Sequence, residues 1–201
     1  MFNVKALFAR ALLALAFVLG AAPAMAGPIY RVTIDTSAFA GTSGFLDLTF
    51  NGLGNAAPAT ATLANFTGNF GAFSVVEGDA RGDLASGVVL GNGTGFNDFL
   101  QEVVFGGLFS FDVSFGLQGE GAGTTFGVAL FDEAFSTFLG AAGNVAEIAL
   151  MPGEADALMA VEGVAAIASV TAVPEPADWL LVMTGLGLMA VAAQRGRLRR
   201  G

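Results

Sequence analysis

The chain of 201 residues contains neither cysteine nor histidine. Because it has no cysteine, it has no disulfide bonds, and its fold depends on a buried core. The absence of histidine removes the commonest general base and the commonest zinc ligand. We therefore assign no catalytic residue, no cofactor and no resident metal from the sequence, and we expect a protein that is not an enzyme.

Basic residues are almost as scarce in the middle of the chain. Only Arg31 and Arg81 lie between Gly27 and Val173, whereas fifteen of the seventeen acidic residues lie there. Two positive charges against fifteen negative ones give this segment a formal net charge of −13. Such a surface repels the phosphates of nucleic acids and is typical of a well-solvated domain. We expect no nucleic-acid partner.

Residues 1–26 have the pattern of a secretory signal peptide, which we expect to be helical. Lys5 and Arg10 precede an apolar run at residues 11–19, and small residues follow at the positions that a signal peptidase reads. The predicted cleavage signal consists of Ala24, Ala26 and Gly27, with the cut after Ala26. Signal peptidase and the export machinery would then be partners. The alternative is an uncleaved N-terminal membrane anchor.

Residues 27–173 alternate between apolar and small or polar side chains with a period of two. In the clearest stretch, residues 109–117, every odd position is apolar, so a pleated strand would bury one face. The same alternation recurs at Tyr30, Val32 and Ile34, at Leu46, Leu48 and Phe50, and at Phe126, Val128 and Leu130. The pattern predicts a single all-β domain, an antiparallel β-sandwich of jelly-roll or related type with about eight to ten strands.

Other segments of this domain have weaker patterns. Six further strand candidates are residues 61–66, 70–76, 86–90, 99–105, 147–151 and 164–173. Residues 132–143 and 154–161 suit either a helical turn or a short helix. The domain has no tryptophan and only Tyr30, and its phenylalanines fall largely on the expected core face. We therefore do not expect a surface platform of stacked aromatic rings.

Residues 174–201 form a tail with three successive features. Pro174-Glu175-Pro176 must end the last strand, because proline cannot donate to a β-ladder and paired prolines favour an extended chain. Residues 179–193 carry no charge and would form a transmembrane helix about 22 Å long, which gives a thin span. Trp179 suits the outer interface, and the arginines behind the span favour the cytoplasmic side. These arginines are Arg195, Arg197, Arg199 and Arg200.

A Pro-Glu-Pro motif, one hydrophobic helix and an arginine-rich end, in this order, resemble the tripartite sorting tail of PEP-CTERM proteins. The resemblance covers the C-terminal tail alone. It implies processing by an exosortase-type transpeptidase, a membrane-embedded cysteine enzyme, in a Gram-negative bacterium whose surface is rich in exopolysaccharide. Pro174, Glu175 and Pro176 would be its substrate, and the catalytic residues would belong to that partner. The alternative is an ordinary single-pass C-terminal anchor.

Two kinds of candidate site lie inside the domain. Glu77, Asp79 and Asp83 stand on a glycine-containing stretch and are candidate Ca²⁺ ligands, although their spacing is not that of an EF-hand and a solvated turn explains them as well. Asn65-Phe66-Thr67 and Asn92-Gly93-Thr94 fit the acceptor pattern for N-glycosylation, but asparagine in a turn is the simpler interpretation for the second.

These observations predict an exported protein that spans the inner membrane during sorting and then reaches the cell surface or extracellular matrix. Its acidic domain is expected to be structural or adhesive in an exopolysaccharide or biofilm setting. One alternative is a carbohydrate-binding module, with or without Ca²⁺, whose ligand is the exopolysaccharide. A third hypothesis is a glycoside hydrolase that uses Asp98 with Glu102 or Asp132 with Glu133, although adjacent residues on a strand point to opposite faces.

Overall fold

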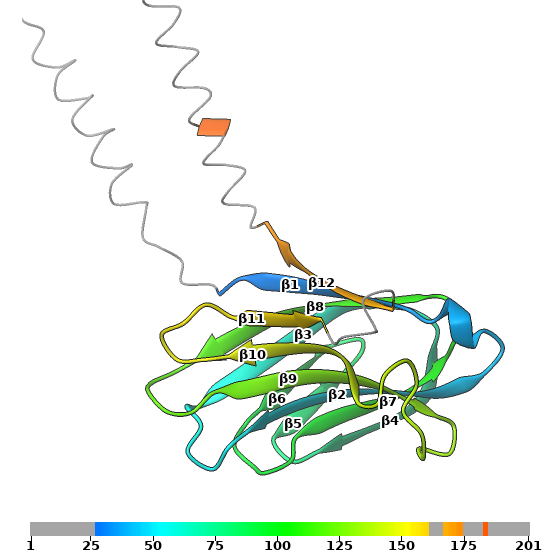
Figure 1. The fold of residues 1–201 in the computed structure, drawn as a ribbon, viewed down its shortest axis with the longest axis horizontal. Helices are drawn as coiled ribbons and strands as arrows, with labels where there is room; N and C mark the ends of the chain where they lie inside the picture. The colour runs from blue at the N-terminus through cyan, green and yellow to red at the C-terminus, as the bar shows by residue number, and fades with distance from the viewer. Residues whose placement is uncertain (1–26, 161–166, 175–182, 185–201) are drawn as a thin grey trace, which may run out of the picture.

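The computed structural model describes residues 27–160, 167–174 and 183–184. These residues form twelve β-strands in two antiparallel sheets of six strands, stacked as a β-sandwich (Figure 1). The predicted all-β antiparallel fold is therefore confirmed. Among the described residues, no helix is both long and apolar enough to cross a membrane. The expected signal helix at residues 1–26 lies outside the described residues, and so does the expected transmembrane helix, except for Met183 and Thr184.

The first sheet has the strand order β12-β1-β8-β3-β6-β5. Its strands are β1 (Ile29–Asp35), β3 (Ala59–Thr67), β5 (Ala80–Asp83), β6 (Gly87–Gly91), β8 (Leu108–Leu117) and β12 (Ala168–Val173). The second sheet has the order β11-β10-β9-β2-β7-β4. Its strands are β2 (Ser43–Gly52), β4 (Phe70–Glu77), β7 (Asp98–Val104), β9 (Thr124–Asp132), β10 (Asn144–Leu150) and β11 (Ala157–Ala160).

Alternating apolar residues of both sheets face each other and form the core. The predicted inward residues of β1, β2 and β9 are all at most 6% exposed. Phe109, Phe111 and Val113 of β8 are buried with them, while Phe115 and Leu117 pack against the core and are partly buried. A glycine makes one close approach possible, because a Cβ on Gly44 would lie 2.7 Å from the ring of the buried Phe105.

The structure corrects some of the expected elements. Twelve strands replace the expected eight to ten, because the short strands β5 and β11 have no clear alternation. Asp132 ends β9, and residues 133–143 form turns and bends with an isolated bridge at Phe138 rather than a helix. Of residues 154–161, residues 157–160 form the strand β11, and residue 161 lies outside the described residues. The first part of the expected strand at 164–173 lies outside the described residues, and β12 begins at Ala168. The part of the domain that the structure describes also contains a short helical turn, η1 (Ser37–Phe39), which was not predicted.

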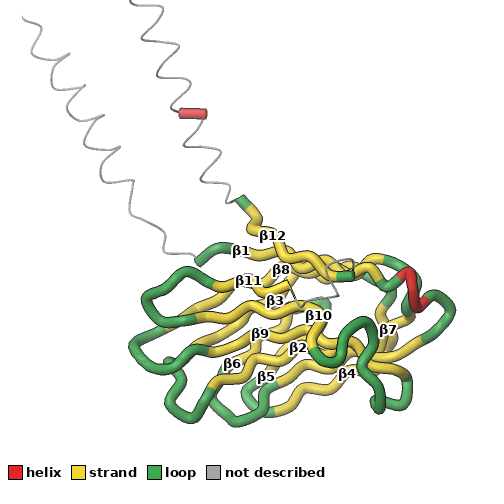
Figure 2. The backbone as a smooth tube through the Cα atoms, in the orientation of Figure 1, coloured by secondary structure: helices red, strands yellow, loops and turns green. Residues whose placement is uncertain are grey.

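Within the two sheets, the strands from β1 to β8 pair in a nested order along the chain. Strand β1 pairs with β8, β2 pairs with β7, and β3 pairs with β6, each in antiparallel register. The chain between β1 and β8 therefore folds back on itself like one long hairpin that is rolled into two layers. Turns and loops gather at the two ends of the sandwich (Figure 2).

The two ends of the sandwich differ in what they hold. Ile29 at the start of β1 pairs with Val173 at the end of β12, so the chain enters and leaves the sandwich at one end. We call this the terminal end. Strand β1 runs to Asp35 at the opposite end, where η1 leads into β2 at Ser43. We call this the distal end.

Candidate functional site

The three candidate Ca²⁺ ligands do not form one site. Glu77 ends β4 in the second sheet, whereas Asp83 ends β5 in the first sheet and accepts hydrogen bonds from the amides of Ala85 and Ser86. Asp79 lies in the turn between them, and its carboxylate accepts a long hydrogen bond, 3.3 Å, from the amide of Gly93. Among the described residues, no group of three or more acidic side chains is placed to hold a metal ion.

The first carboxylate pair considered for hydrolysis is also separated. Asp98 and Glu102 stand on the same face of β7, four residues apart, with Leu100 between them. Their Cα atoms are about 13 Å apart along an extended strand. Glycosidase carboxyl groups are separated by roughly 5–9.5 Å, so the backbone spacing does not favour this pair.

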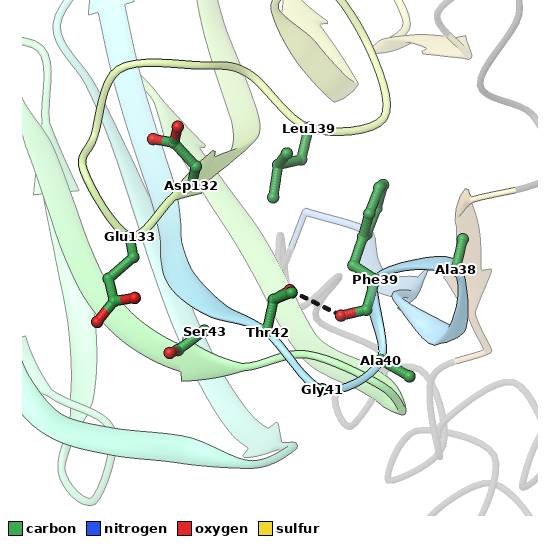
Figure 3. Close-up of a pocket in the computed structure, with 9 residues that line it drawn as sticks. All are labelled: Ala38, Phe39, Ala40, Gly41, Thr42, Ser43, Asp132, Glu133 and Leu139. Atoms are coloured by element: carbon green, nitrogen blue, oxygen red, sulfur yellow. Dashed lines mark hydrogen bonds between the residues drawn. The ribbon is translucent and has the colours of Figure 1, made fainter.

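The second pair, Asp132 and Glu133, borders a hollow of about 560 Å³ at the distal end (Figure 3). The side chain of Asp132 accepts hydrogen bonds from the amides of Ser136 and Thr137 and from the hydroxyl of Ser136. These bonds hold the pKa of Asp132 below its usual value. Figure 3 shows the two carboxylates pointing apart. Asp132 therefore fixes its own loop and is not placed as a general acid.

A different carboxylate pair, Asp47 and Asp98, is buried on the outer face of the second sheet. Asp98 lies directly opposite Thr49, which places it diagonally from Asp47 across the β2–β7 ladder. Asp47 is 7% exposed and Asp98 is 6% exposed. Within the described part of the chain, one buried carboxylate oxygen of each, Oδ1, has no hydrogen-bond partner. Unpaired buried polar atoms are rare in proteins and therefore require an explanation.

Burial also changes the acidity of this pair. Desolvation raises the pKa of Asp47 to about 7, and the charge of Asp98 adds to the shift. Desolvation, with the charge of Glu77, raises the pKa of Asp98 to about 6. Both carboxyl groups therefore bind protons more tightly in the folded protein than in an unfolded chain.

Five phenylalanine rings form a connected row near the distal end of the second sheet. The ring of Phe45 lies 6.1 Å from that of Phe73 and 5.9 Å from that of Phe135. The ring of Phe131 lies 4.2 Å from that of Phe135 and 4.4 Å from that of Phe138. We call these five residues the aromatic row. Phe73, Phe135 and Phe138 are 52%, 47% and 43% exposed, so these three rings lie outside the core face on which most of the phenylalanines were expected.

Register explains why this row lies outside the core. Phe45 pairs with Phe131 of β9 and with Glu102 of β7, one residue out of phase with the buried Leu46. Phe135 belongs to the loop that Asp132 fixes and has a positive φ of 52°. This backbone conformation is strained for a bulky side chain. The loop therefore holds an aromatic ring against the sheet at a cost in backbone energy.

Glu102 brings a carboxylate into the aromatic row. It lies opposite Phe45, and its Oε2 accepts a hydrogen bond of 3.2 Å from the amide of Phe73. Gly71 leaves room for this carboxylate, because a Cβ there would lie only 2.3 Å from Oε2. The strands of the second sheet contain no lysine or arginine, so their charged side chains are all acidic.

The two possible glycosylation acceptors have structural partners. The amide of Asn92 donates to the carbonyl of Ala57 and to Thr124 Oγ1, and its oxygen accepts from the amide of Ala59. A glycan would displace these bonds. Asn65 occupies a bulge of β3 with a φ of 56° and donates to Asp112 Oδ2. Both asparagines are therefore explained by the fold.

The candidate residues at the ends of the chain are mostly outside the described residues. Gly27 and Pro174 are described and flank the sandwich at its terminal end. Ala24 and Ala26 of the cleavage signal, Glu175 and Pro176 of the motif, Trp179 and the four terminal arginines lie outside the described residues. Their assignments stay predictions.

Comparison with known proteins identified no relative. No protein-family model matches the chain, no curated protein matches it, and no solved structure matches it.

Proposed function

We propose that this chain is an exported protein of the cell surface or extracellular matrix, sorted through a C-terminal tail of the PEP-CTERM kind. In this proposal a signal peptide directs export, residues 179–193 hold the chain in the inner membrane, and an exosortase-type partner processes the Pro174-Glu175-Pro176 segment. The acidic sandwich is the cargo, with a structural or adhesive role in an exopolysaccharide setting.

The observation that carries this proposal is the place where the sandwich ends. Val173 closes β12 directly opposite Ile29, and Pro174 follows at once. In the chain, the proposed signal peptide would precede β1 and the proposed motif would follow β12, so both would adjoin the terminal end. A processing enzyme would meet an extended, proline-rich peptide at the terminal end rather than a strand that must first be unfolded.

We also propose that the sandwich is a jelly roll. The nested pairs β1·β8, β2·β7 and β3·β6 support this topology, in which a long hairpin rolls into two sheets. Strand β5 departs from the nesting because it pairs with β6 rather than with β4. The additional strands β9 to β12 extend both sheets at their other edges.

Replacement of Pro174, Glu175 and Pro176 by alanine tests the sorting proposal. We expect the variant to remain in the membrane fraction as a larger species, because the transpeptidase loses its substrate motif while the hydrophobic segment is unchanged. The mass of the mature wild-type protein, which reports both cuts and any attached group, is the matching measurement. Mature protein that extends to Gly201, or a variant of unchanged size and location, would contradict the proposal.

The second candidate function is carbohydrate binding, and the aromatic row is the observation that favours it. Sugar-binding surfaces commonly combine exposed aromatic rings with carboxylates that accept hydrogen bonds from hydroxyl groups. The hydrolase hypothesis has no comparable support, because Asp98 and Glu102 are far apart along β7 and Asp132 is committed to its loop.

A further inference from the structure

We propose that the aromatic row and Glu102 form a docking surface for a cationic amino-sugar polymer. This inference deepens the proposed function and rests on it, because the proposed location at the cell surface or in the extracellular matrix is where the protein would meet such a polymer. The surface itself is defined by the described residues alone. Three observations support it, namely the exposed rings, the charge around them, and their position on the sandwich.

Five connected rings, of which three are exposed, indicate an interaction surface. Contiguous apolar patches on soluble proteins often mark binding sites, whereas single exposed apolar residues need no explanation. The row crosses β4, β2 and β9 and continues into the loop after β9, so the rings span several strands. The strained backbone of Phe135 is a second sign, because strain of this kind is concentrated at functional sites.

Charge identifies the class of ligand. Glu102 lies within the row, and none of the strands of this sheet carries a lysine or arginine that would compensate its charge. An acidic polysaccharide or a second copy of this acidic domain would be repelled. A protonated amino sugar offers an ammonium group to Glu102 and to the faces of the rings, and an apolar ring face for stacking.

The position of the row favours a polymer over a peptide. Its centre lies above β2, which is paired on both sides with β7 and β9 and has no free edge for an added strand, and Phe73 alone lies on the edge strand β4. At the centre of the row, recognition must therefore use side chains. The row is also near the distal end, since Phe45 follows the start of β2, and the terminal end is left for the tail.

The test measures binding of a fully deacetylated glucosamine hexamer to the full chain in non-ionic detergent, at mildly acidic pH, by calorimetry. The neutral N-acetylglucosamine hexamer and an anionic galacturonate hexamer are compared under the same conditions. We expect the deacetylated hexamer to bind and the anionic one not to bind. The acetylated hexamer should bind at least about 5-fold more weakly, because it lacks the ammonium group.

Variants then locate the surface. Phe73→Ala and Glu102→Gln are expected to weaken binding by about 5-fold or more each. Gly71→Ala should weaken binding to a similar extent, because the added methyl group would displace the Glu102 carboxylate. This substitution itself removes neither a ring nor a charge. The matched controls are Phe96→Ala, which removes a ring equally exposed at 52% but outside the row, and Glu120→Gln in the loop after β8. Circular dichroism checks that each variant is folded.

Three results would overturn the proposal. They are no binding of the deacetylated hexamer, equal losses in the row variants and their controls, and binding of a lysine hexapeptide with the same affinity and the same sensitivity to the variants. The last result would identify a general cation surface instead. None of them bears on the processing of the tail, which the mass of the mature protein tests separately.

Discussion

Asp47 shows how a single residue can contradict the pattern that contains it. The sequence Leu46-Asp47-Leu48 alternates as expected for a strand with one face in water, yet the Asp47 carboxyl is buried on that outer face. Its direct neighbours across the ladder are Leu100 and Ala129, and neither can hydrogen-bond to it through its side chain. A buried acid without such a partner favours its protonated form.

Replacement of Asp47 by asparagine should therefore stabilise the protein at high pH. The pKa of Asp47 is raised to about 7 by burial, well above its value in an unfolded chain. A group with a raised pKa contributes stability below its unfolded pKa and loses that contribution as the pH rises through about 7. We expect the wild-type free energy of unfolding to fall by roughly 2–4 kcal/mol from pH 4 to pH 8 through this group. Asp47→Asn should flatten that fall.

The measurement is chemical denaturation of both proteins across this pH range. Asp35→Asn is the control, because the hydroxyl and amide of Ser37 hold the pKa of Asp35 below its usual value. Asp35 therefore contributes stability above its unfolded pKa and loses it as the pH falls, so its substitution should not stabilise the protein at high pH. If Asp47→Asn destabilises the protein equally at both ends of the range, the carboxyl group has an unrecognised partner.

At the scale of strands, alternation predicted most of the fold. It identified the buried residues of β1, β2, β8 and β9, because each of these strands has one face in the core. It missed β5 and β11, which are four residues each and too short to show a period. Their formation depends on pairing with β6 and β10 rather than on their own sequence.

The candidate site was less predictable because it too depends on pairing between strands that are distant in the sequence. Phe45 and Phe131 are outward residues, but the sequence does not show that they are adjacent, since the β2–β9 pairing joins segments about 85 residues apart. Phe135 and Phe138 lie in a loop that has no period at all. The signal that was available is Phe45 itself, which precedes Leu46 and so stands on the opposite face from the core.

Tyr30 connects elements that belong to different sheets. Its hydroxyl donates a hydrogen bond of 2.7 Å to Asp156 in the connection between β10 and β11, while its ring is buried in the core. Burial and this carboxylate raise the pKa of Tyr30 to about 12. Tyr30→Phe should lower the free energy of unfolding by about 0.5–1.5 kcal/mol, because the hydrogen bond is lost and the ring remains.

Denaturation followed by circular dichroism measures this change. Asp156→Asn is the matched variant, because its amide oxygen still accepts from the Tyr30 hydroxyl, and its loss should be smaller. Hydrogen exchange should locate the effect of Tyr30→Phe in the β10–β11 connection. Equal losses in both variants would mean that the charge of Asp156, rather than the hydrogen bond, links the two sheets.

At the scale of the molecule, the two ends of the sandwich imply an orientation. The chain enters at Ile29 and leaves at Val173, and the aromatic row is nearer the opposite end. If the tail holds the unprocessed protein in a membrane, the terminal end must face that membrane. The negative charge of the domain also favours this orientation, because anionic headgroups repel the domain and only the tail holds it at the membrane surface.

This orientation is measurable because the chain has no cysteine to remove. Gly54 follows β2 at the terminal end and Gly107 precedes β8 at the distal end, and a Cβ at either position meets no atom within 4 Å. In a chain whose Pro174-Glu175-Pro176 segment is replaced by alanine, each site is changed to cysteine, labelled with a donor dye and reconstituted into vesicles with an acceptor lipid. We expect stronger energy transfer from residue 54 than from residue 107, and detergent should abolish the difference. Equal transfer, or stronger transfer from residue 107, would mean that the sandwich lies on its side or is inverted, and the distal surface would then not project from the membrane.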